Sequence, residues 1–175
     1  MRPNRACGEG DEKGAAVVEF ALVAPFLLVI LFAILDLGKA FNYWIDTTQM
    51  ASAGARYAVV NSNPGATVPQ TLQQYIQAQG ATSELRTADA TSLNVKQPAQ
   101  VCITFPSGTS TLGQPVRVDV RVKYNWLPFL RDNLPIIGRV FSATQITLKG
   151  TSTMRLEAAP TNYSSGAGST GTDAC

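Results

Sequence analysis

The sequence contains no histidine and only three cysteines, at positions 7, 102 and 175. Histidine is the most common general base near neutral pH and the most common protein ligand of metal ions, and the cysteines lack the CxxC spacing of a zinc site. The chain also has no GxSxG nucleophile motif, no phosphate-binding glycine loop and, outside residues 1–14, no close pair of carboxylates. These absences predict a protein that is not an enzyme, holds no metal or other cofactor and has no small-molecule substrate.

Charged residues are scarce as well, because they make up 15% of the chain and leave a formal net charge of only +2. Arg117, Arg121 and Lys123 alternate with valines and with Asp119, so they do not form the dense basic face that a nucleic-acid-binding protein needs. We therefore expect no nucleic-acid partner. A chain of 175 residues has room for one domain beside a membrane helix.

The dominant feature that is present is an apolar run from Ala15 to Leu35, in which Glu19 is the only charged residue. As a helix these 21 residues would be about 31 Å long, which matches a hydrocarbon core of about 30 Å. The run predicts a transmembrane helix over residues 15–36, surrounded by membrane lipid. A carboxylate at mid-membrane costs about 3 kcal/mol, so Glu19 either reaches the headgroups from the end of the run or meets a partner.

The positive charges near this run predict its orientation. Arg2, Arg5 and Lys13 precede it, whereas only Lys39 lies within a dozen residues after it. The positive-inside rule then places the N-terminus in the cytoplasm and the C-terminal domain outside, with residues 1–14 as a cytoplasmic leader. An alternative is a secretory signal peptide cleaved after Ala40, although its apolar core would exceed the usual length of about 7–15 residues.

Beyond the run, the 3–4 spacing of apolar and small residues predicts that the helix continues over residues 37–60 as an amphipathic segment. The residues with this spacing are Leu37, Phe41, Trp44, Thr48, Ala51, Ala55 and Ala58. We expect this stripe to pack on the extracytoplasmic domain. The alternative is that its small residues, around Gly54, form a seam for neighbouring helices.

The domain over residues 61–157 is predicted to combine a short helix with a small antiparallel sheet, an α+β fold. A capping box at Thr67–Gln70 starts the helix, and alternating apolar residues predict four strands, near 91–96, 101–105, 116–124 and 144–157, with a bulge at Gly150. The apolar residues 126–141 either cover the open end of the sheet or form an exposed patch. Residues 158–175 are rich in Ser, Thr and Gly and are predicted to be a flexible tail.

A membrane-spanning helix would separate Cys7 from the other two cysteines. Cys102 and Cys175 would then share an oxidising exterior, where a disulfide between them would contribute about 4 kcal/mol of stability. Whether the two pair is left open by the sequence.

The stretch from Gly14 to Pro25, GAAVVEFALVAP, resembles the start of the TadE-like family, minor pseudopilins of the tight-adherence (Flp) pilus system. The resemblance lies in a glycine before the apolar run, a glutamate as the fifth residue after it and a proline further on; it extends to about Val60 and returns weakly in the C-terminal strands. It implies a type IV pilin-like fold and cleavage by a prepilin peptidase between Gly14 and Ala15. Alanine after the cleaved glycine, where major pilins have phenylalanine, and the large domain imply a minor, initiating or tip-associated subunit.

The same resemblance implies roles for Glu19 and Pro25. Glu19 would accept the new amino group of Ala15 on a neighbouring subunit and so set the register of assembly, and Pro25 would let the helix bend as subunits pack. The implied partners are the peptidase, other pseudopilins and the pilus assembly platform, at the bacterial cytoplasmic membrane and, after processing, in the pilus. A non-enzymatic alternative is a single-pass anchor whose outer domain binds a partner without any processing.

Overall fold

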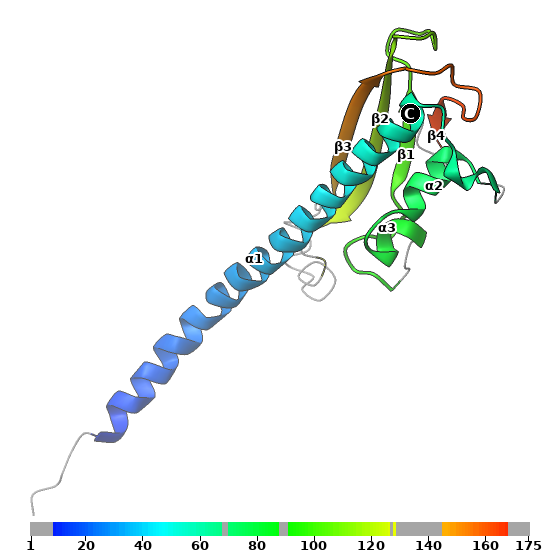
Figure 1. Cartoon of the computed structure of the whole chain (residues 1–175). Coiled ribbons are helices and arrows are strands. Elements are labelled where there is room, and N and C mark those ends of the chain that lie inside the picture. Colours follow the sequence, from blue (N-terminus) through cyan, green and yellow to red (C-terminus); the bar gives the residue numbers. More distant parts are fainter. Residues whose placement is uncertain (1–8, 68–69, 88–90, 127, 129–144, 168–175) are drawn as a thin grey trace, which may run out of the picture. The chain divides into compact units, whose positions relative to one another are not determined.

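The computed structural model (Figure 1) describes residues 9–67, 70–87, 91–126, 128 and 145–167. Its contacts divide the chain into two units, Met1–Gly38 and Lys39–Cys175. The helical elements are α1 (Glu9–Val59), the 3-10 helix η1 (Pro64–Thr67), α2 (Leu72–Ala78) and α3 (Ser83–Thr87). The strands are β1 (Gln100–Thr104), β2 (Pro115–Asn125), β3 (Gln145–Arg155) and β4 (Gly166–Ala167). Residues 127 and 129–141, and with them nearly all of the predicted apolar segment, lie outside the described residues.

Helix α1 starts earlier than the sequence suggested. Its backbone is helical from Glu9, so Gly14 and Pro25 both lie inside the helix. Once a helix has nucleated in a long run of helix-forming residues, each further residue adds a hydrogen bond at little cost, and the helix extends into the polar residues before the run. The bond between Gly14 and Ala15 therefore belongs to a helix and not to a junction between leader and helix.

The second unit is built on one antiparallel sheet with the strand order β3-β2-β1-β4. The valines of β2 and Tyr124 are buried on one face, together with Val101 and Ile103 of β1. The last turns of α1 lie across that face in Figure 1, and Ala51 and Ala55 are fully buried there. The predicted α+β fold, a long N-terminal helix on a small antiparallel sheet, is confirmed.

Gly150 is the point where the helix comes closest to the sheet. It pairs with Val120 in an uninterrupted one-to-one register, so the predicted bulge was wrong. A Cβ at this position would overlap the carbonyl of Thr47 and lie 2.6 Å from the backbone nitrogen of Thr48. The glycine is required because the helix backbone, and not a side chain, rests on the strand.

The predicted stripe on the second half of α1 divides into two groups. Its small residues, such as Ala51 and Ala55, are buried against the sheet, whereas Phe41 and Trp44 are 54% and 48% exposed. The small residues therefore pack inside the domain. A Cβ added at Gly54 would lie 2.6 Å from the side chain of Ile76, so this position already faces the domain core, and the alternative of an intermolecular seam around Gly54 was wrong.

The capping box exists, but four residues later than predicted. The Thr71 side chain accepts a hydrogen bond from the Gln74 amide at 3.3 Å, and the Gln74 side chain accepts one from the Thr71 amide at 3.0 Å. The sequence TVPQTLQQ contains the Thr-x-x-Gln pattern twice. The second copy is used because it places Leu72 and Ile76 on the buried face of α2.

The first predicted strand, over residues 91–96, does not form. Asn94 instead lies against the end of β2, where its side chain donates to the Tyr124 hydroxyl at 3.0 Å and to the Asn125 carbonyl at 3.1 Å. The Asn125 amide donates in return to the Asn94 carbonyl at 2.7 Å. Alternation of apolar residues alone did not distinguish this buried turn, with Val95 inside, from a strand.

Part of the predicted C-terminal tail is bound to the domain. The Asn61 side chain, which follows α1 in the left-handed conformation (φ 52°), accepts from the amides of Thr161 and Asn162, both at 2.9 Å. The Tyr163 hydroxyl donates to the Ala58 carbonyl at 2.8 Å, and Gly166 pairs with β1. The expectation of a flexible tail from residue 158 is thus corrected for residues 161–167, because polar residues there complete the end of α1; residues 168–175 lie outside the described part.

Candidate processing and assembly site

The predicted cleavage site lies on an open part of α1. Gly14 and Ala15 are both exposed, and a Cβ built on Gly14 would meet no atom within 4 Å. A glycine inside a helix lowers helix stability by about 1 kcal/mol relative to alanine. The backbone at Gly14 can therefore unwind more easily than that of the apolar residues that follow.

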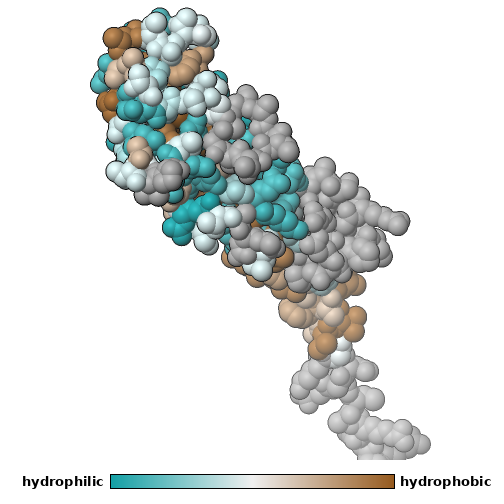
Figure 2. Space-filling view, turned by 90° about the vertical axis from the view of Figure 1, so that its right-hand side faces the viewer, coloured by the Kyte–Doolittle hydropathy of each residue, from teal (hydrophilic) through white to brown (hydrophobic). Residues whose placement is uncertain are grey.

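The apolar residues after Gly14 are left without cover. Large side chains from Val17 to Leu35 are 39–73% exposed, and the most apolar stretch of the helix has a mean hydropathy of 2.8 with none of it buried inside the protein. Figure 2 shows hydrophobic residues on the exposed helix and hydrophilic ones over much of the domain. By length and composition, α1 is able to cross a membrane.

Glu19 stands alone on this apolar surface. Its side chain is exposed, and among the described residues it has no hydrogen-bond or ion-pair partner. Pro25, six residues further on, is exposed as well and does not interrupt the helix. Gly14, Ala15, Glu19 and Pro25 thus lie on one helix, and all four are exposed.

The same residues lie in the part of the chain that matches a known family. Residues 14–56 match the model of the family described as TadE-like protein. These residues are TadE-like. A search of curated proteins found no match, and a search of solved structures also found none.

The TadE-like match covers about a quarter of the chain and contains all four residues of the predicted processing and assembly site, but neither Cys102 nor Cys175. This match points to the tight-adherence pilus system and its components. The TadE-like family is structural and pilus-associated rather than catalytic. The sheet lies outside the matched residues.

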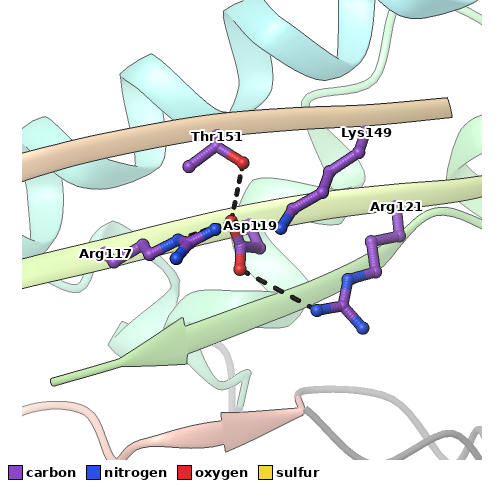
Figure 3. A network of polar contacts seen from close by, with 5 residues as sticks. All are labelled: Arg117, Asp119, Arg121, Lys149 and Thr151. Carbon is purple, nitrogen blue, oxygen red and sulfur yellow. Dashed lines mark hydrogen bonds and ion pairs between the residues drawn. The ribbon is translucent and has the colours of Figure 1, made fainter. Parts of the chain in front are cut away.

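A second cluster of functional groups lies on the face of the sheet that points away from α1 (Figure 3). Asp119 is 5% exposed and is surrounded by three cations. Its Oδ1 lies 3.0 Å from Nε of Arg117 and 3.4 Å from Nζ of Lys149, and its Oδ2 lies 3.9 Å from a guanidinium nitrogen of Arg121. The Thr151 hydroxyl donates to Oδ1 at 2.7 Å.

These neighbours determine the charge state of Asp119. Burial by itself raises the pKa of its carboxyl, but the hydrogen bonds from Thr151 and Arg117 and the charges of Arg117 and Lys149 outweigh burial and bring the pKa below its usual value. One ionised carboxylate thus faces three cations, and the cluster retains a positive excess.

The sequence could not have revealed this cluster. The alternation in β2 places Arg117, Asp119 and Arg121 on one face, and that much is visible in the sequence. Lys149 and Thr151 come from β3, and only the pairing of Asp119 with Thr151 brings them beside the carboxylate. The register between two strands about 20 residues apart leaves no local signal.

Of the two cysteines in the predicted disulfide, the structure describes Cys102. Cys102 lies on β1, directly opposite Asp119, and is disulfide-bonded. Cys175 lies outside the described residues, so the pairing of Cys102 with Cys175 stays a prediction. Within the described ranges, no group of three or more His, Cys, Asp or Glu side chains is placed to hold a metal ion.

Proposed function

We propose that this chain is a minor pseudopilin of a tight-adherence pilus or a related secretion apparatus, processed by a prepilin peptidase after Gly14 and active in pilus assembly or initiation. The observation that carries the proposal is an unpartnered Glu19 on an exposed apolar helix, five residues after an accessible glycine, inside the TadE-like residues. Removal of residues 1–14 leaves Ala15 with a free amino group at the end of the span.

The chemistry of Glu19 explains why processing and assembly would be linked. An unpaired carboxylate in lipid is costly, and a cation at hydrogen-bonding distance removes much of that cost. The Ala15 amine of a neighbouring subunit supplies such a cation only after cleavage. Because the pair forms in one register only, it aligns the helices as well as holding them together. Pro25 supplies a position at which the helix bends during this packing.

The proposed location follows from the same helix. Residues 15–36 cross the bacterial cytoplasmic membrane once, with Arg2, Arg5 and Lys13 on the cytoplasmic side. The sheet domain, residues 61–157, then lies outside, together with Cys102 and Cys175. Processed chains are drawn by the assembly platform into a complex with other pseudopilins.

Replacement of Glu19 by leucine tests this proposal. The variant should insert into the membrane at least as well as the wild type, because a charge is removed from lipid, but its recovery with the other pilus components after membrane solubilisation should fall strongly. Glu157→Leu provides a control, because Glu157 is also exposed but lies outside the TadE-like residues. Normal recovery of the Glu19→Leu chain would favour the alternative of a permanently anchored domain, whose binding does not depend on Glu19.

A further inference from the structure

Strand β3 forms an open edge of the sheet. All eleven of its residues pair one-to-one with β2, without a bulge or a proline. Among the described residues no strand pairs with its other side, and most of its residues are exposed. Such an edge presents a row of free N–H and C=O groups, which is the template that an extended segment of another chain uses when it adds to a sheet.

The face of this edge that points away from α1 is basic. Lys149 and Arg155 lie on β3, and Arg117 and Arg121 lie beside them on β2. Asp119 is the one acidic residue on β2 and β3, and its carboxylate is already shared among three of these cations. A strand added next to β3 would place every second side chain beside Lys149, Thr151 and Thr153, where acidic groups would be favoured.

On the opposite face, which points toward α1, the two ends of β3 carry apolar side chains, and the helix backbone covers the middle of the strand. Ile146 is 40% exposed, and Leu148 and Met154 are only partly covered by the core. Between them lies Gly150, over which the backbone of Thr47 and Thr48 passes. Apolar side chains of an added strand would therefore cover Ile146 and Met154, and a small residue beside Gly150 would keep clear of the helix backbone that passes there.

We propose that β3 is a docking edge for an extended segment of a partner protein, in which acidic residues alternate with apolar ones and a glycine or alanine passes Gly150. A second copy of β3 does not fit this description, because it would bring further lysine and arginine to a face that already has a positive excess, and like charges on neighbouring strands repel. The charge of Lys149 thus disfavours pairing of β3 with a second β3 and favours pairing with an acidic segment. The proposal does not depend on cleavage after Gly14.

The test uses the full chain in detergent micelles and three labelled peptides. The first, Val-Glu-Val-Glu-Gly-Glu-Val-Glu-Val, matches both faces of the segment from Ile146 to Met154 and reads the same in both chain directions. The second has proline in place of the two inner valines, so it keeps the charge but loses backbone donors. The third has lysine in place of glutamate. Fluorescence anisotropy measures binding, and amide hydrogen exchange of β3 reports strand addition.

The first peptide should bind and slow hydrogen exchange along β3, and the other two should do neither. The double variant Lys149→Gln, Arg155→Gln should weaken binding by about fivefold. The double variant Arg56→Gln, Arg86→Gln removes the same charge from exposed positions outside the sheet and should bind like the wild type.

Three results would overturn the proposal. The first is absence of binding by the first peptide. The second is binding of the proline peptide as tight as that of the first peptide, which would show that charge attraction, and not strand pairing, accounts for the binding. The third is protection of β3 by anionic phospholipid vesicles that the first peptide cannot displace, which would make the basic face a lipid contact.

Discussion

The two parts of helix α1 differ in where their side chains find partners. Before Gly38, large apolar side chains are exposed and Glu19 has no partner among the described residues. From Lys39 on, small residues pack on the sheet, and polar ones such as Asp46, which accepts from the Ala81 amide at 2.8 Å, are satisfied inside the domain. Substitutions in the second part should therefore reduce the stability of the isolated chain, whereas substitutions of the exposed side chains within residues 14–35 should affect only assembly.

The largest effect is expected where helix and sheet backbones meet. Gly150→Val places side-chain atoms where the backbone of Thr47 lies, so the helix must move away, and the free energy of unfolding should fall by about 3 kcal/mol or more. Gly38→Ala, in the first unit, meets no atom within 4 Å and should leave stability unchanged or slightly raised. Chemical unfolding of both variants in micelles, followed by near-ultraviolet circular dichroism, checks the difference. Equal stabilities would show that α1 does not rest on β3.

An intermediate effect is expected at Asp119. Asp119→Asn removes a buried charge that accepts bonds from Thr151 and Arg117 and should cost about 1–3 kcal/mol. Glu19→Gln, which removes a carboxylate without an internal partner, should not change the unfolding free energy. If both variants lose stability equally, the contrast between the two parts of the chain fails.

The stability provided by Asp119 should depend on pH. Because its folded pKa lies below the unfolded value of about 3.9, ionisation stabilises the folded chain above that value, and this contribution is lost as the pH falls through the folded pKa. The difference between wild type and Asp119→Asn should thus be constant near neutral pH and decrease below about pH 4. Unfolding curves of both proteins across this range provide the measurement, and a difference that persists at low pH would argue against an ionised Asp119.

The smallest effect is expected at the C-terminal segment. Tyr163→Phe removes the hydrogen bond to the Ala58 carbonyl and should cost about 1 kcal/mol. Burial raises the pKa of Tyr163 to about 12, so its absorbance change in an alkaline titration should come later than that of an ordinary tyrosine and be missing in the variant. Val23→Ala, on the exposed helix, should leave stability unchanged. A normal titration for Tyr163 would mean that residues 161–167 are not bound to the domain.

The sequence predicted those features that depend on local pattern. The apolar run gave the helix, and the strict alternation of VRVDVRVKY gave β2 with its buried and polar faces. It failed where two local patterns competed, as in the repeated Thr-x-x-Gln motif, and where a residue acts through a distant neighbour. Gly150, Asn94 and Tyr163 are examples, because each is explained by a contact with a residue at least 30 positions away. Glu19 could be singled out from the sequence because a charge in an apolar run is itself a local pattern, and its role in assembly stays a prediction.

The mature N-terminus tests the central claim most directly. Intact mass and N-terminal sequencing of the chain recovered from membranes of cells with and without the prepilin peptidase would measure it. We predict a chain that starts at Ala15 when the peptidase is present and a chain that keeps residues 1–14 when it is absent. A chain that keeps residues 1–14 in both, or one that starts at Phe41, would contradict processing after Gly14 and with it the pairing proposed for Glu19.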